Sequence, residues 1–177
     1  RAPALFVLPC SNRDCKDAPG DFLTIASMRF AEIQAGQFID AGTVSVSEQD
    51  IVGFARAFDP QWFHLDPQRA QSSRWNGLIA SGWHTCSLAM KLVVDNVLAG
   101  SESFGSPGVD ELRWNNPVRP GDRLHLQVEV VDVRRARSRP TLGIVRWIWR
   151  MRNQREAEVL SLDVTSLFEL DSLAARG

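Results

Sequence analysis

The spacing of apolar residues predicts a helix in the middle of the chain. From Ser81 to Leu98 apolar side chains occupy most positions. Four polar side chains recur there at intervals of three and four residues: His84, Ser87, Lys91 and Asp95. Such spacing places them on one narrow stripe, so the rest of the helix surface must be nearly surrounded by protein. We expect Gly100 to end this helix as a C-cap.

After this helix the apolar pattern changes to alternation, which is typical of strands. Four segments are predicted to be strands, with alternation clearest in the last three: residues 108–114, 123–133, 145–151 and 160–168. The alternation changes parity at Val131, and this predicts a β-bulge. Trp147 and Trp149 share one face of their strand, where we expect core packing or a dimer contact.

The first half of the chain combines one strand with short helices. Gly42–Val46 is the predicted strand. Ser47, with Asp50 three residues later, has the pattern of an N-cap that opens a helix. Residues 58–77 then contain Asp59-Pro60 and Asp66-Pro67. Asp followed by Pro suits an N-cap and a first helical position, so this excursion is predicted to form two short helical turns.

The order of these elements predicts an α+β fold. Strands that follow one another along a chain pair in antiparallel fashion. An antiparallel sheet curled around one long buried helix satisfies both the composition of the helix and the alternation of the strands. This is the arrangement of the hotdog fold.

Composition restricts the class of protein. The chain has 177 residues, of which 44% are hydrophobic and 23% charged, and this suits one globular domain. A net charge of -1 provides no overall field for nucleic acid or an anionic membrane. No run of 18 apolar residues predicts a membrane span. Three cysteines, Cys10, Cys15 and Cys86, cannot all pair within one chain, and we expect a cytoplasmic, reducing environment.

The first 27 residues differ from the rest of the chain. They show no sustained period, and Met28 opens a segment that resembles an ordinary domain start. We expect residues 1–27 to be a leader, an expression remnant or an over-extended start, and residues 28–172 to form a single domain.

Three ordered segments resemble one known family. They are Phe58–Pro67, Asn76–Trp83 and Asn116–Asp122. Together they resemble the MaoC-like dehydratases and (R)-specific enoyl-CoA hydratases, over roughly residues 28–170. The hydratase motif of that family has Asp, then Asn-Pro, then His. Here Asp59 and His64 keep that spacing, while Gln61 and Trp62 replace the Asn-Pro.

The resemblance implies hydration of an enoyl thioester, or the reverse dehydration, without a cofactor. Adding water to such a double bond needs a group that takes a proton from water, a group that handles the proton at the α-carbon, and a donor to the enolate oxygen. Asp59 and His64 are expected to share one water, and the backbone N–H of Gly82 to bind the oxyanion. We expect six residues to contact the substrate: Gln61, Trp62, Phe63, Ser81, Trp83 and His84.

The motif by itself does not identify a side chain that contacts the Asp59 carboxylate. In some relatives a Ser one to two turns further along the helix contacts the Asp, whereas Met90 occupies that position here. This support is therefore missing or comes from elsewhere, with Ser87 and His84 as candidates.

The sequence also bears on other ligands and activities. No His, Cys, Asp and Glu side chains have metal-ligand spacing, and no glycine-rich phosphate loop is present. The basic run Arg134–Arg139 is predicted to be a solvated hairpin, with a dock for coenzyme A phosphates as the alternative. The expected partners are an acyl-CoA or acyl-carrier thioester and a second copy of the chain. A hotdog thioesterase and a non-catalytic acyl-thioester binding subunit are the alternative functions.

Overall fold

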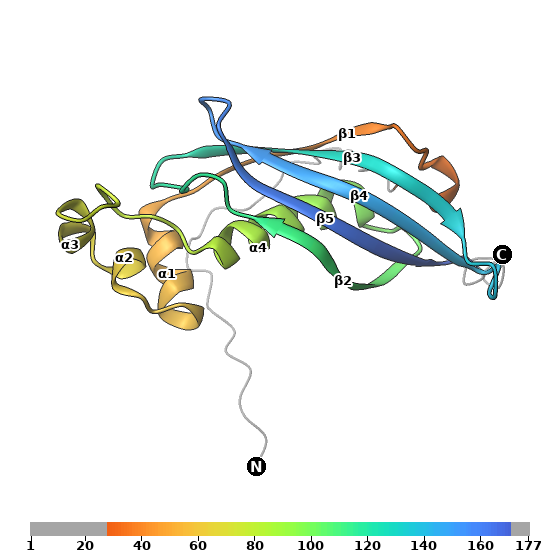
Figure 1. The fold of residues 1–177 in the computed structure, drawn as a ribbon, viewed down its shortest axis with the longest axis horizontal. Helices are drawn as coiled ribbons and strands as arrows, with labels where there is room; N and C mark the ends of the chain where they lie inside the picture. The colour runs from red at the N-terminus through yellow and green to blue at the C-terminus, as the bar shows by residue number, and fades with distance from the viewer. Residues whose placement is uncertain (1–27, 171–177) are drawn as a thin grey trace, which may run out of the picture.

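The computed structural model describes residues 28–170. The predictions for residues 1–27, Cys10 and Cys15 included, and for residues 171–172 lie outside the described residues. The described part forms a five-stranded antiparallel sheet in the order β1-β3-β4-β5-β2, which arches over helix α4 (Figure 1). The predicted α+β class, a sheet curled against one long helix, is confirmed.

The strands are longer than the sequence pattern predicted. Their bounds are β1 Phe38–Ser45, β2 Ser103–Arg113, β3 Arg123–Arg135, β4 Leu142–Arg152 and β5 Glu158–Glu169. The pairing of β3 with β4 shifts register between Val130 and Asp132, so the predicted bulge at Val131 is confirmed. Trp147 and Trp149 of β4 are fully buried on the helix-facing side of the sheet and belong to the core.

Helix α4 runs from Gly82 to Val93 and continues as a π-helical turn, η2, from Val94 to Leu98. Ser81 caps its start, and Gly100 lies just beyond its end with φ 75°. One side of the helix is buried in the core. On the other side Trp83, Met90 and Val94 are exposed. The expectation that protein nearly surrounds this helix is therefore wrong for one face of the helix in the single chain.

Three short helices project beyond the end of the sheet at which β1 ends (Figure 1). They are α1 Glu48–Phe58, α2 Trp62–Leu65 and α3 Pro67–Gln71. Ser47 and Asp50 form the predicted capping box of α1, with each side chain accepting a hydrogen bond from the other residue's backbone N–H.

The N-cap predictions for the two Asp-Pro pairs have different outcomes. Asp66 caps α3 and accepts a hydrogen bond of 3.0 Å from Arg69 N–H, as predicted. Asp59 instead ends α1 as its C-cap, and Gln61 is the N-cap of α2. The Asp59 N–H donates to the Ala55 carbonyl oxygen in the last turn of α1, and its side chain accepts a hydrogen bond from the Gln61 side-chain amide.

Candidate active site

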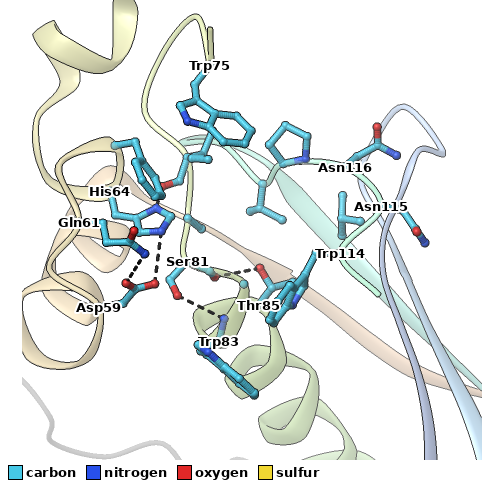
Figure 2. A pocket seen from close by; sticks show the side chains of 17 residues that line it. Asp59, Gln61, His64, Trp75, Ser81, Trp83, Thr85, Trp114, Asn115 and Asn116 are labelled. Carbon is cyan, nitrogen blue, oxygen red and sulfur yellow. Dashed lines mark hydrogen bonds and ion pairs between the residues drawn. The ribbon is translucent and has the colours of Figure 1, made fainter. Parts of the chain in front are cut away.

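A cavity of about 430 Å³ lies between α2, the start of α4 and the segment that follows β2. We call it the first cavity. Figure 2 shows Asp59, Gln61, His64 and Ser81 close together on one side of it, with Asn115 and Asn116 on the other side. Its lining combines four residues at this polar end with four aromatic walls: Asp59, His64, Ser81, Gly82, Phe63, Trp75, Trp83 and Trp114.

Asp59 and His64 meet at the polar end of the first cavity. Asp59 Oδ2 lies 3.3 Å from His64 Nε2 (Figure 2). The His64 ring is buried, and its Nδ1 lies 2.8 Å from the Ile79 carbonyl oxygen. A carbonyl can only accept, so Nδ1 carries a proton and donates it to this bond. In the neutral ring, Nε2 is therefore an acceptor that lies beside the carboxylate.

Two neighbours hold the Asp59 carboxylate. The Ser81 hydroxyl hydrogen-bonds to it, and the Gln61 side-chain amide donates to Oδ1 over 2.8 Å. The hydrogen bond from Ser81 is the largest cause that lowers the pKa of Asp59, and the hydrogen bond from Gln61 adds to it, although burial opposes this shift. Asp59 is therefore an ionised acceptor near neutral pH.

Ser87 and His84, the candidates for this support, are engaged elsewhere. The Ser87 hydroxyl donates to the Trp83 carbonyl oxygen over 2.9 Å. The His84 ring stacks on Phe54 of α1, with 4.8 Å between ring centroids. Gln61, which replaces Asn in the motif, and Ser81, the N-cap of α4, provide the contacts to the Asp59 carboxylate that Met90 does not.

Gly82 is the first residue of α4 and forms part of the cavity wall. At this position a backbone N–H has no acceptor within the helix, and the helix dipole favours negative charge. A Cβ on Gly82 would overlap the indole of Trp114. The absence of a side chain at Gly82 therefore lets the Trp114 ring pack directly against the start of α4.

The structure distributes the six expected contact residues unevenly. Four of them line the first cavity: Gln61, Phe63, Ser81 and Trp83. Trp62 and His84 are not among its lining residues. The Trp62 ring lies under the Arg69 guanidinium at 4.5 Å. His84 is enclosed between α1 and α4, where burial lowers its pKa, with only partial opposition from Asp50.

Sequence reasoning did not assign Trp114 to the site, and it considered Trp75 only as a side chain that could reshape the pocket. Trp75 reaches the cavity from the loop after α3 and packs near Phe63, with 5.9 Å between ring centroids. Trp114 comes from the end of β2, far from the motif along the chain. Trp114 lies just before the Asn116–Asp122 segment, and this position was the one signal in the sequence that could have placed it at the site. The alternation of apolar residues on a strand does not tell whether a given tryptophan faces a cavity.

The described residues contain no cluster of three or more His, Cys, Asp or Glu side chains that could hold a metal ion. None of the helices in that part of the chain is long and apolar enough to cross a membrane. The basic run Arg134–Arg139 begins on the last two residues of β3 and continues into the turn before β4, where Arg139 pairs with Glu169. The thirteen residues of β3, each with a rise of about 3.3 Å, separate this turn from the segment that lines the first cavity. The turn is therefore at the far end of β3 from that cavity.

Fold and site together define a hotdog protein with a carboxylate–imidazole pair at the amino end of its central helix. The MaoC like domain matches residues 28–147, and the chain belongs to this family. The family assignment and the hotdog fold expected from the sequence are thus confirmed.

Among similar proteins, a MaoC-like dehydratase from Rhodospirillum rubrum superposes with a TM-score of 0.75 at 35% identity, covering 81% of this chain and 97% of that chain. The uncharacterised protein YdeM of Bacillus subtilis is 32% identical over 80% of this chain and 99% of its own length. The 3-hydroxyacyl-thioester dehydratase Z of Mycobacterium tuberculosis is 29% identical over 51% of this chain and 61% of its own. The similar proteins thus include dehydratases.

Proposed function

We propose that this protein is a hydro-lyase that adds water to the 2,3-double bond of an enoyl thioester, of the enoyl-CoA type, or removes it from the 3-hydroxyacyl thioester. The observation that supports this most is the Asp59–His64 pair, with 3.3 Å between Oδ2 and Nε2, at the wall of a cavity that also includes the start of α4. The dehydratases among its relatives support the same reaction class.

The two side chains suit a single water molecule. Ionised Asp59 and the Nε2 of neutral His64 are both hydrogen-bond acceptors. A water has two O–H groups, and it can donate one to each acceptor. Its oxygen then has its lone pairs directed away from the pair, towards a substrate in the cavity.

The reaction adds one oxygen and two hydrogens of this water. The water oxygen forms a bond to C3 while one of its protons passes to the Asp59–His64 pair. The C2=C3 electrons move towards the thioester and form an enolate. A proton from the pair then bonds to C2, so the protein regains its starting protonation state. Dehydration runs through the same steps in reverse.

The enolate oxygen needs a hydrogen-bond donor as its charge develops. In this proposal the Gly82 N–H at the start of α4 donates to it. Glycine admits the thioester carbonyl close to the backbone. The Trp114 ring lies against Gly82 and excludes water from one side of that donor, which strengthens the interaction.

Asp59→Asn and His64→Ala test this proposal. Asp59→Asn removes the negative charge and the proton-accepting carboxylate, and His64→Ala removes the imidazole. Hydration of crotonyl-CoA should therefore fall by about 10²–10⁴-fold, measured as loss of absorbance of the conjugated double bond. Circular dichroism and the melting temperature should show a folded protein. As a matched control, Asp66→Asn changes the carboxylate of the other Asp-Pro pair and should leave turnover near that of the wild type.

Two further measurements separate the alternative functions. Release of free thiol from acyl-CoA, detected colorimetrically, would indicate a thioesterase. A rise in melting temperature with crotonyl-CoA that is not consumed would indicate a binding subunit. Wild-type turnover in both Asp59→Asn and His64→Ala would remove the catalytic assignment.

A homodimer is the second part of this proposal. β2 is an edge strand of the sheet, so one side of it has backbone groups without a strand partner. Exposed apolar side chains occur on β2, on the residue after it, and along α4 and η2: Trp83, Met90, Val94, Phe104, Val109 and Trp114. A second copy pairing edge to edge along β2 would cover these side chains and continue the sheet.

A further inference from the structure

A second cavity, of about 280 Å³, lies between α4 and the β2 side of the sheet. Trp149 of β4 and Leu162 and Val164 of β5 form its deep wall, and all three side chains are buried. Cys86 and Met90 of α4 form another wall. The mechanism proposed above uses none of these five residues.

The two cavities are neighbours separated by two tryptophans. Trp83 lines both of them. Trp114 lines the first cavity, lies against Gly82, and forms a hydrogen bond with the Cys86 thiol of the second cavity. The rings of Trp83 and Trp114 meet edge to face, with 5.4 Å between centroids and an angle of 80°. Trp83 and Trp114 thus lie in contact with each other where the two cavities adjoin.

The lining of the second cavity suits an apolar chain. Aliphatic, sulfur and aromatic side chains make up nearly all of it. Its one buried donor without a partner is the indole N–H of Trp149, a residue that is 1% exposed. An unpaired buried N–H costs free energy that a water or a ligand oxygen would offset. The ligand groups that suit this cavity are therefore mainly methylene groups.

We propose that Trp83 and Trp114 set the length of acyl chain that the protein accepts, and that the second cavity holds the distal carbons of an acyl thioester once this pair is opened. This inference rests on the proposed function for the identity of the ligand. By this inference Trp83 and Trp114 are specificity-determining residues. The native substrate is then an acyl chain short enough to end at their rings.

The proposed dimer is compatible with this use of the second cavity. Trp83, at 58%, and Met90, at 46%, are exposed at its mouth, whereas its deep wall belongs to the sheet. A second copy along β2 would cover the mouth and leave a closed space beside the first cavity. If instead a side chain of the second copy fills the space, opening the tryptophan pair will admit no longer chain.

The test uses saturated acyl-CoA thioesters, which bind without turnover, from four to twelve carbons. In the wild-type protein the dissociation constant, measured by calorimetry, should improve with length only up to a short chain. In Trp83→Ala the improvement should continue for several further carbons, at about fourfold per methylene. Trp114→Ala is the second variant, with the same expected direction.

Two controls make the result specific. Trp75→Ala enlarges the first cavity at a wall that the second cavity does not share, so it should not extend the length range in the same way. Met90→Trp, added to Trp83→Ala, fills the second cavity and should cancel the gain. A wild-type protein that already binds long chains with increasing affinity, or a Trp83→Ala range that Met90→Trp does not shorten, would overturn the inference. Failure to hydrate crotonyl-CoA would count against the proposed function only, because these binding measurements need no reaction.

Discussion

At the scale of single residues, the candidate site depends on how one carboxylate is held. Asp59 ends helix α1, and the break at Pro60 turns its side chain towards the start of α4. There the Ser81 hydroxyl and the Gln61 amide hydrogen-bond to it, and His64 lies beside it. Sequence spacing could indicate Asp59 and His64. It indicated Ser81 only as a substrate contact and not as a partner of this carboxylate, because an N-cap serine has the same pattern whether or not a carboxylate lies next to its hydroxyl.

Ser81→Ala should change the pH dependence of turnover. Without the hydroxyl, the pKa of Asp59 rises because burial still raises it and the largest opposing contact is lost. Activity requires the ionised carboxylate in this mechanism, so the acid limb of the kcat/KM profile should move to higher pH. Loss of the N-cap should also cost about 1 kcal/mol of stability.

Ser87→Ala is the matched control for that experiment. Its hydroxyl donates to the Trp83 carbonyl oxygen on the same helix, so the acid limb should stay in place. An acid limb that does not move in Ser81→Ala would show that Ser81 acts only as a helix cap.

Gly82→Ala should destabilise the protein because of a clash with one neighbour, Trp114. Its new Cβ would overlap the Trp114 indole, and such overpacking costs about 1–3 kcal/mol. In the double variant with Trp114→Ala the overlap is gone. The two changes should therefore be non-additive in denaturant unfolding, with a coupling of about 0.5–3 kcal/mol. Additive free energies would mean that Trp114 moves aside freely.

At the scale of elements, helices α1 and α4 meet at a buried histidine. The His84 ring stacks on Phe54, and its Nδ1 has no hydrogen-bond partner. The polar stripe predicted on α4 included His84 because residue type alone classes it as polar. In the structure it is a contact between two helices, and Ser87 and Lys91 of that stripe are exposed.

His84 should make stability depend on pH. Burial lowers its pKa in the folded protein below the ordinary value of 6.5, so the unfolded chain takes up the proton first as pH falls. Its contribution is fully present above pH 6.5 and is lost as pH falls towards the folded-state pKa. His84→Phe keeps a ring against Phe54 without a titrating group, and should flatten this part of the stability curve in urea unfolding between pH 7 and 5. An unchanged slope would contradict the assignment.

At the scale of the whole molecule, the exposed face of α4 and the free edge of β2 are the largest departure from the sequence prediction. The helix composition indicated a surface nearly surrounded by protein, yet Trp83, Met90 and Val94 are exposed in the single chain. If the proposed dimer forms, the apolar composition is explained by a second copy, because a sequence pattern records burial without distinguishing which chain supplies it.

Val109→Lys should weaken that dimer. Val109 is on β2 and 52% exposed, so a lysine there would bring like charges together across a two-fold edge. The mass from light scattering should fall from twice the chain mass towards the chain mass. Val131→Lys is the control, since it places the same charge at an exposed valine of β3, away from that edge. A wild-type protein that is monomeric at assay concentrations would contradict the interface.

The sequence by itself determined the elements, their order, the bulge at Val131 and the residues of the Asp59–His64 motif, because periodicity, capping and spacing are local properties of a chain. Only the tertiary structure decided which side chains surround that motif. Trp75 and Trp114 reach the first cavity from segments far apart along the chain, and Trp62 and His84, adjacent to the site in sequence, lie outside its lining. The reason is physical: a cavity is formed by surfaces from several elements, and their relative placement depends on packing that no single segment contains.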